Sequence, residues 1–213
     1  MVGLDTLLAF SLAALLLSLS PGPSNLYIMA RSINQGRSSG YAAASGLAIG
    51  SIIYVIATAL GMAALFKYFP IAYVILKLGG AIYLVYLGIQ YWRTPASTTT
   101  SPVTKYKSHA AVFRQSIIVE LTNPKTALFF IAFLPQFVEP ANGSVTMQLM
   151  ILGSVYALLA FVSDLLVATL SGELGRYLNR HRQVGSKLDK TSGLILLGLG
   201  GYIGSNEVLE QIT

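Results

Sequence analysis

Long apolar stretches separated by short charged segments dominate the chain. Three intervals contain no charged residue at all: 6–30, 38–66 and 140–163. Each of them can hold the roughly 20 apolar residues that span a bilayer as a helix. Three further apolar intervals carry only a few charges. The pattern therefore predicts six membrane-spanning helices, at about 5–30, 40–66, 71–92, 112–138, 146–172 and 188–207.

Composition supports a membrane protein. Apolar residues make up 54% of the 213 residues and charged residues only 10%, whereas about a quarter of the residues in a soluble domain are charged. So few charges cannot cover a solvated surface. The chain has no cysteine, which excludes disulfides and thiolate metal sites. We therefore expect an all-α membrane protein.

The distribution of lysine and arginine predicts the orientation. Eleven of the 14 Lys and Arg residues lie in the loops after the first, third and fifth spans, and only Lys67 lies on the opposite side. Loops rich in Lys and Arg remain in the cytoplasm. Both termini are therefore expected on the non-cytoplasmic side. The same bias explains the net charge of +6 without a nucleic-acid partner.

The chain is expected to form one transmembrane domain, residues 1–213, built from two halves. A linker rich in Pro, Ser and Thr, residues 94–107, separates half-repeats at about 1–93 and 108–213. Each half has three predicted spans. Because three is odd, the halves enter the membrane from opposite sides, which is the 3+3 inverted repeat common among secondary transporters.

The first and fourth spans are predicted to be broken. Pro21 and Pro23 remove backbone donors, and Gly22 between them adds backbone freedom, so the first helix cannot continue regularly. In the fourth span, Asn123 or the residue before it is a suitable N-cap, and Pro124 suits the first position of a restarting helix. Broken helices in a membrane expose backbone groups that must line a cavity or find protein partners.

The two breaks are expected to form one polar site together with an intramembrane acid. At a rise of 1.5 Å per residue, Pro23, Pro124 and Asp164 lie about 12, 16 and 12 Å from the cytoplasmic surface. The restarting helices offer amides to a carboxylate, and the carbonyls at residues 18–20 suit an ammonium group. The candidate substrate-binding residues are Pro21, Gly22, Pro23, Ser24, Asn25, Asn123, Pro124 and Lys125.

Four ionisable residues lie away from the ends of the predicted spans, and each needs an explanation because a charge inside the membrane costs roughly 2.5–3.5 kcal/mol. Asp164 either carries a coupling proton or binds the substrate ammonium, or else it is locked to Lys125 or Lys77. Lys125 either binds a carboxylate or pairs with Glu120 or Asp164. Lys77 either takes part in coupling or snorkels to the outer surface. Candidates for proton coupling or ion pairing are thus Asp164, Glu120 and Lys77.

Polar uncharged positions are less specific. Ser51, Tyr54 and Thr58 share one helical face, and they either line the pathway or hydrogen-bond neighbouring helices. Gly46 and Gly50 are typical of close helix packing. The sequence contains no His, Asp and Glu cluster with metal-ligand spacing, no Ser-His-Asp arrangement and no phosphate-binding loop. We therefore expect neither an enzyme nor a bound metal or cofactor.

Several motifs resemble one family along most of the chain. They are Leu-Ser-Leu-Ser-Pro-Gly-Pro at 17–23, Leu-Lys-x-x-Gly-Ala at 76–81, Leu-Thr-Asn-Pro-Lys at 121–125 and Phe-Leu-Pro-Gln-Phe at 133–137, with an aspartate at 164. In this order they resemble the LysE/RhtB amino-acid exporters, with the threonine/homoserine branch nearest. Ser24, Ser116 and Glu120 depart from the family's pattern, and Ser24 and Glu120 flank the breaks.

The resemblance implies export of amino acids across the inner membrane of bacteria, driven by proton influx. The sequence thus predicts a secondary active exporter of small amino acids, threonine- or homoserine-like or otherwise neutral, working by proton antiport. Its partners are the amino acid, protons and the bilayer, and the glycine-rich faces permit a homo-oligomer. The alternatives are an exporter of an inorganic cation and a membrane scaffold or assembly factor that transports nothing.

Overall fold

The computed structural model describes residues 2–20, 22–69 and 106–180, together with isolated positions in the ranges 71–89 and 194–201. Across these residues the secondary structure is helical and contains no strand, which confirms the all-α prediction. The expected spans 71–92 and 188–207 fall outside the described residues apart from the isolated positions. Only the last two residues of the expected linker are described.

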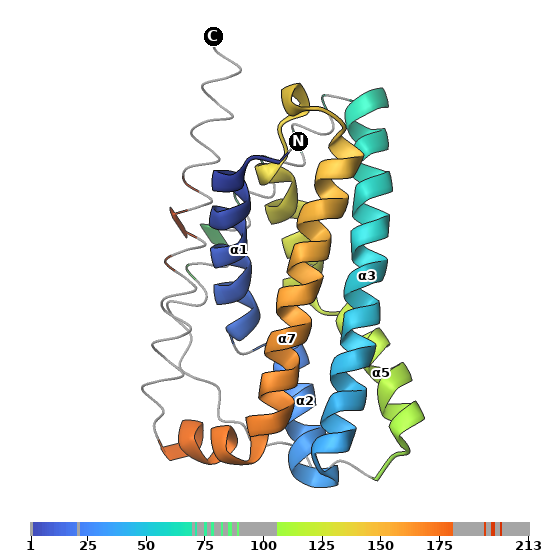
Figure 1. Ribbon diagram of the computed structural model, residues 1–213, viewed down its shortest axis with the longest axis vertical. Coiled ribbons are helices and arrows are strands. Elements are labelled where there is room, and N and C mark those ends of the chain that lie inside the picture. The colour runs from blue at the N-terminus through green and yellow to red at the C-terminus, as the bar shows by residue number, and fades with distance from the viewer. Residues whose placement is uncertain are drawn as a thin grey trace.

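Two long helices form the centre of the described bundle. Helix α3, Arg37–Tyr68, and helix α7, Val145–Arg180, pack against each other and run in opposite directions (Figure 1). Within them, Arg37–Met62 and Val145–Ser171 are long and apolar enough to cross a membrane. These segments confirm the predicted spans at 40–66 and 146–172.

Each of the other two described spans is a bent pair of helices. Helix α1, Leu4–Leu19, and helix α2, Pro23–Gln35, meet at 51°. Helix α5, His109–Leu121, is followed by α6, Pro124–Leu128, and by the short helical segments η1, Phe129–Phe133, and η2, Leu134–Phe137, with a bend of 48°. The predicted breaks are therefore present, and the described residues hold four candidate spans if each bent pair counts as one.

Short connections carry the chain between these segments. Between α2 and α3 the chain turns at Gly36, whose φ of 87° is a conformation that residues with a Cβ rarely adopt. A further short helix, η3, Pro140–Asn142, leads into α7. The turn at Gly36 lets α3 run back along α2, and the two helices are in contact.

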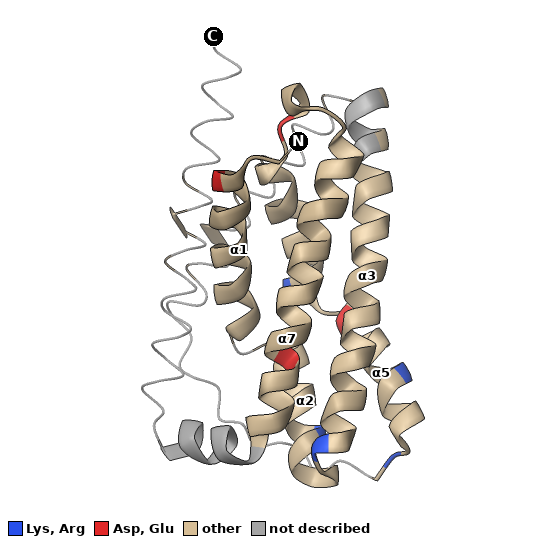
Figure 2. Cartoon of the chain, in the orientation of Figure 1, with Lys and Arg blue, Asp and Glu red and all other residues tan. Residues whose placement is uncertain are grey.

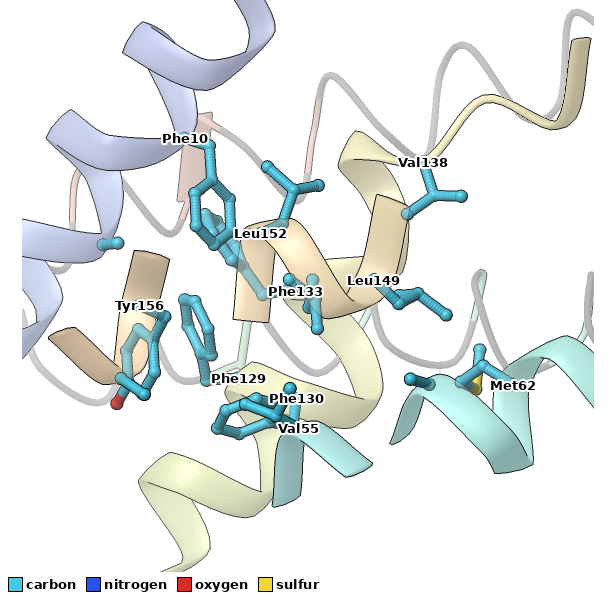
Figure 3. Packing of buried hydrophobic residues seen from close by; sticks show 14 of the residues in the cluster. Phe10, Val55, Met62, Phe129, Phe130, Phe133, Val138, Leu149, Leu152 and Tyr156 are labelled. Carbon is cyan, nitrogen blue, oxygen red and sulfur yellow. The ribbon is translucent and has the colours of Figure 1, made fainter. Parts of the chain in front are cut away.

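Buried apolar side chains form two clusters, called upper and lower after their places in the view of Figure 1. The upper cluster is centred on α1, η1 and the first part of α7, and Figure 3 shows Phe10, Phe133 and Tyr156 within it. The lower cluster joins α2, the start of α3, the start of α5 and the later part of α7. It contains Ile28, Met29, Ala43, Ala44, Leu47, Val112, Val167 and Ala168.

Helices α3 and α5 approach closely through two glycines. A Cβ on Gly46 would collide with the carbonyl oxygen of Phe113, and a Cβ on Gly50 would lie 2.6 Å from the Cβ of Glu120. These contacts agree with the close-packing interpretation of the glycine pair. Because Glu120 lies at the second contact, the glycine face also fixes how deeply this carboxylate sits between the helices.

The Gly46→Ala variant is expected to lose about 1–3 kcal/mol of unfolding free energy, because the added methyl overpacks against backbone that cannot rotate away. Thermal unfolding of the detergent-purified protein measures the loss. The matched control is Gly61→Ala on the same helix, where the added Cβ would meet no described atom within 4 Å apart from the adjacent residues and the backbone of its own helix. Equal stability of the two variants would contradict the close contact.

Candidate functional site

The end of α1 presents backbone carbonyls at the first break. The Ser18 carbonyl accepts a hydrogen bond from Asn25 Nδ2 at 3.1 Å, and the Ser20 carbonyl accepts one from the same nitrogen at 3.2 Å. Lys125 Nζ also donates to the Ser20 carbonyl, at 2.8 Å. The negative end of the α1 dipole is thus stabilised by an amide from α2 and a cation from the other half of the chain.

The second break restarts as the sequence predicts. Asn123 is the N-cap of α6, its Oδ1 accepts from the Lys125 amide at 3.0 Å, and Pro124 takes the first helical position. Asn123 Nδ2 donates to Ser24 Oγ at 2.8 Å. One side chain therefore caps the second break and holds it against the first.

Glu120 lies at the centre of a buried hydrogen-bond network. Its carboxylate accepts from Ser24 Oγ at 2.5 Å, from Ser51 Oγ at 3.0 Å and from Thr126 Oγ1 at 3.0 Å. The side chain is 4% exposed. These donors come from α2, α3 and α6, so the carboxylate joins three elements to α5. Hydroxyl donors thus compensate the buried charge.

Asp164 projects from α7 towards the same place. It is 8% exposed, and Lys125 and Glu120 are close enough to interact with it electrostatically. Within the described part of the chain its carboxylate accepts no hydrogen bond. The neighbouring Ser163 Oγ lies 3.0 Å from Ser18 Oγ, which ties α7 to the end of α1. Asp164 therefore lies beside the first break, and its carboxylate oxygens can still accept hydrogen bonds.

These groups line one small polar cavity. Its volume is about 20 Å³, which is room for water but well below the roughly 300–1,000 Å³ of pockets that enclose small molecules. An amino acid therefore requires lining side chains to move. The lining residues are Ser18, Gly22, Ser24, Asn25, Glu120, Asn123, Lys125, Thr126, Tyr156, Ala160 and Asp164.

The cavity lies between the two apolar clusters. Along α7, members of the upper cluster lie within residues 145–157, Ala160 and Asp164 line the cavity, and residues 167–168 belong to the lower cluster. Along α3, the lower cluster takes residues 43–47, Ser51 bonds Glu120, and the upper cluster takes residues 55–62. Along these two helices, apolar clusters thus lie on both sides of the polar site.

The structure brings together most of the residues singled out from the sequence. Pro23 and Pro124 begin α2 and α6, while Pro21 and Lys77 lie outside the described residues. Ser51 and Tyr54 hydrogen-bond α5, since Tyr54 Oη donates to the Leu121 carbonyl at 2.7 Å. The candidate residues that line the cavity are Gly22, Ser24, Asn25, Glu120, Asn123, Lys125 and Asp164.

Three lining residues, Thr126, Tyr156 and Ala160, were missed from the sequence. Thr126 Oγ1 donates to Glu120 Oε1, six residues earlier, across the break at which the chain bends by 48°. Tyr156 stacks on Phe129, with ring centroids 3.8 Å apart. Tyr156, Ala160 and Asp164 follow one another at intervals of four, so a search along the helical face of Asp164 would have found Tyr156.

The basic residues of the described chain gather mainly at the lower end of the bundle, where α2 ends and α5 begins (Figure 2). There, Gln115 Oε1 accepts hydrogen bonds from Arg31 at 3.2 Å, Lys107 at 2.7 Å and Tyr27 at 3.3 Å. The network joins the two halves of the chain at this end.

The chain is similar to known proteins along most of its length. The model of the LysE type translocator family matches residues 15–207. The homoserine/homoserine lactone efflux proteins of Salmonella typhi and Salmonella typhimurium are each 33% identical to the chain over 197 residues, covering 92% of it and 95% of the relative. An uncharacterized membrane protein of Vibrio cholerae is 31% identical over 193 residues, covering 91% and 93%. No solved structure matches.

These matches extend over nearly the whole chain and over both broken helices. They confirm the resemblance found in the motifs, the membrane location and the expectation of a transporter rather than an enzyme. The chain therefore belongs to the LysE type translocator family.

Proposed function

We propose that this protein is a secondary active exporter of small neutral amino acids, with homoserine and threonine as the first candidates, and that it exchanges them for protons. The observation that carries the proposal is the buried polar cavity where two broken helices, Lys125 and Asp164 meet. Carbonyls, amides and both signs of charge around one cavity suit a zwitterion. The efflux relatives in Salmonella support the choice of homoserine.

In this mechanism the substrate enters the cavity from the cytoplasm. Its carboxylate lies at the restarting amides and Lys125, and its ammonium lies near Asp164 and the carbonyls of Ser18 and Ser20. Proton binding to Asp164 from outside then favours return of the empty site, which couples efflux to proton influx as a shift between two populations. Apolar clusters lie on both sides of the cavity, and each half-cycle opens a path past only one of them.

The proposal also covers the location of the protein, its orientation in the membrane and the relation between its two halves. The protein lies in the bacterial inner membrane with both termini outside the cytoplasm, which the basic residues at the lower end of the bundle support. The halves form a 3+3 inverted repeat in one domain. The order of a bent pair followed by a long helix, seen in α1 to α3 and again in α5 to α7, supports this. The glycine-rich faces allow a homo-oligomer.

Efflux of labelled amino acids tests the proposal directly. Cells that produce the protein are loaded with threonine, homoserine, leucine, lysine or cysteine, each with and without a protonophore. We expect homoserine and threonine to leave faster than from cells without the protein, and the protonophore to abolish the difference. If none of the five leaves faster although the protein is in the membrane, export of small amino acids is wrong.

A further inference from the structure

We propose that Ala160, on α7, limits the size of the substrate side chain that the cavity accepts. The substrate side chain then lies along α7, from Asp164 towards Ala160 and the ring of Tyr156. The inference rests on the proposed export function, which places the ammonium group of the substrate at Asp164. It narrows the substrate class to amino acids with side chains about as small as those of threonine and homoserine.

The lining of the cavity has one apolar side. Among the described residues, eight of the lining side chains are polar or charged, and the lining residue Gly22 has no side chain. Ala160 supplies the aliphatic side chain of this lining, and Tyr156 supplies the aromatic ring. The carbon atoms of a substrate side chain leave water most favourably where they meet apolar atoms. The side formed by Ala160 and Tyr156 therefore receives them.

This apolar side begins one helical turn from Asp164. Ala160 and Tyr156 precede the acid by four and eight residues, so all three share one face of α7. In the opposite direction, residues 167–168 pack in the lower cluster and do not line the cavity. Four residues of helix span about 6 Å. A substrate ammonium at Asp164 therefore places the α-carbon and a short side chain beside Ala160.

The apolar side is also the part of the lining that yields least. Tyr156 is 4% exposed and stacks on Phe129 with ring centroids 3.8 Å apart, and Figure 3 shows both rings. Phe130 meets the ring of Tyr156 edge-on at 5.3 Å. The methyl group of Ala160 is attached directly to the backbone of a continuous membrane-spanning helix. Lys125 can change rotamer to admit a substrate, whereas Ala160 has no other rotamer and fixes the available space.

Selection by size follows from this fixed side. One methylene group more or less in an apolar pocket changes the preference for a substrate about 10–200-fold. Serine and homoserine differ by one methylene group and carry the same functional groups. Ala160→Val fills the apolar side, so it should raise the ratio of serine flux to homoserine flux about tenfold or more. Ala160→Gly enlarges the same side and should raise the ratio of leucine flux to homoserine flux about tenfold.

The test is flux of serine, homoserine and leucine in proteoliposomes, with protein-free vesicles as background. Ratios of fluxes are compared, because a loss of folded protein lowers all three fluxes alike. Ala160→Gly adds no atoms to the packed helices, so it still tests the inference if Ala160→Val folds poorly.

The matched control is Ala157→Val, which adds the same two methyl groups to α7 in the upper cluster, outside the cavity. It should leave both ratios as in the wild type. Unchanged ratios in the two Ala160 variants, or an equal shift in Ala157→Val, overturn the inference. If the wild-type protein moves none of the three amino acids, the proposed function is overturned instead, so the two failures are distinguishable.

Discussion

The Asp164→Asn variant is expected to transport without coupling to protons. The amide has nearly the shape of the carboxylate, so the contacts around α7 remain, but it cannot bind and release the coupling proton. In vesicles with the membrane potential clamped at zero, exchange of one proton per substrate lets a gradient of one pH unit sustain an approximately tenfold substrate gradient. The variant should bring the internal and external concentrations to equality.

Two controls separate uncoupling from inactivation. The variant should still exchange labelled for unlabelled substrate across vesicles without a pH gradient, since the cavity and its other groups are intact. Glu139→Gln, which neutralises an exposed acid outside the cavity, should sustain the same gradient as the wild type. A tenfold substrate gradient that persists in Asp164→Asn would assign the coupling proton to another group.

The helix breaks could be predicted because their causes are local. Pro23 and Pro124 lack the donor that a continuous helix needs, and Asn123 is a suitable N-cap wherever the chain goes afterwards. The common depth of the two breaks and Asp164 followed from the helix rise alone. The gathering of these residues around one cavity agrees with that estimate.

The partners of the charged residues could not be predicted in the same way. The sequence left Lys125 and Glu120 as a possible ion pair, but the Glu120 carboxylate is bound by three hydroxyls. Serine and threonine are common in membrane helices, and their spacing does not tell which acid they face. Ser24, Ser51 and Thr126 meet only because the bends in two helices and the close approach at Gly50 bring α2, α3 and α6 to one point.

The Glu120→Ala variant is expected to lose about 3 kcal/mol or more of unfolding free energy, because buried donors left without an acceptor cost about 1–3 kcal/mol each. Thermal unfolding in detergent measures the loss. Glu120→Gln should lose less, since one amide oxygen still accepts and hydroxyl groups can accept from the amide. Glu139→Ala, at an exposed acid that accepts one hydrogen bond from Asn142 Nδ2 at 2.6 Å, should lose only about 0.5–1.5 kcal/mol.

A double-mutant cycle with Ser51→Ala distinguishes the hydrogen-bond network from simple loss of volume. Ser51 donates to Glu120 at 3.0 Å, so its removal should destabilise the wild type but have little effect once Glu120 is Ala. The coupling energy should lie in the range of about 0.5–3 kcal/mol found for residues in one network. If the two losses of unfolding free energy simply add, the hydrogen bond from Ser51 to Glu120 does not stabilise the fold. The Glu120 carboxylate would then not hold the two breaks together, and a role in transport would explain it instead.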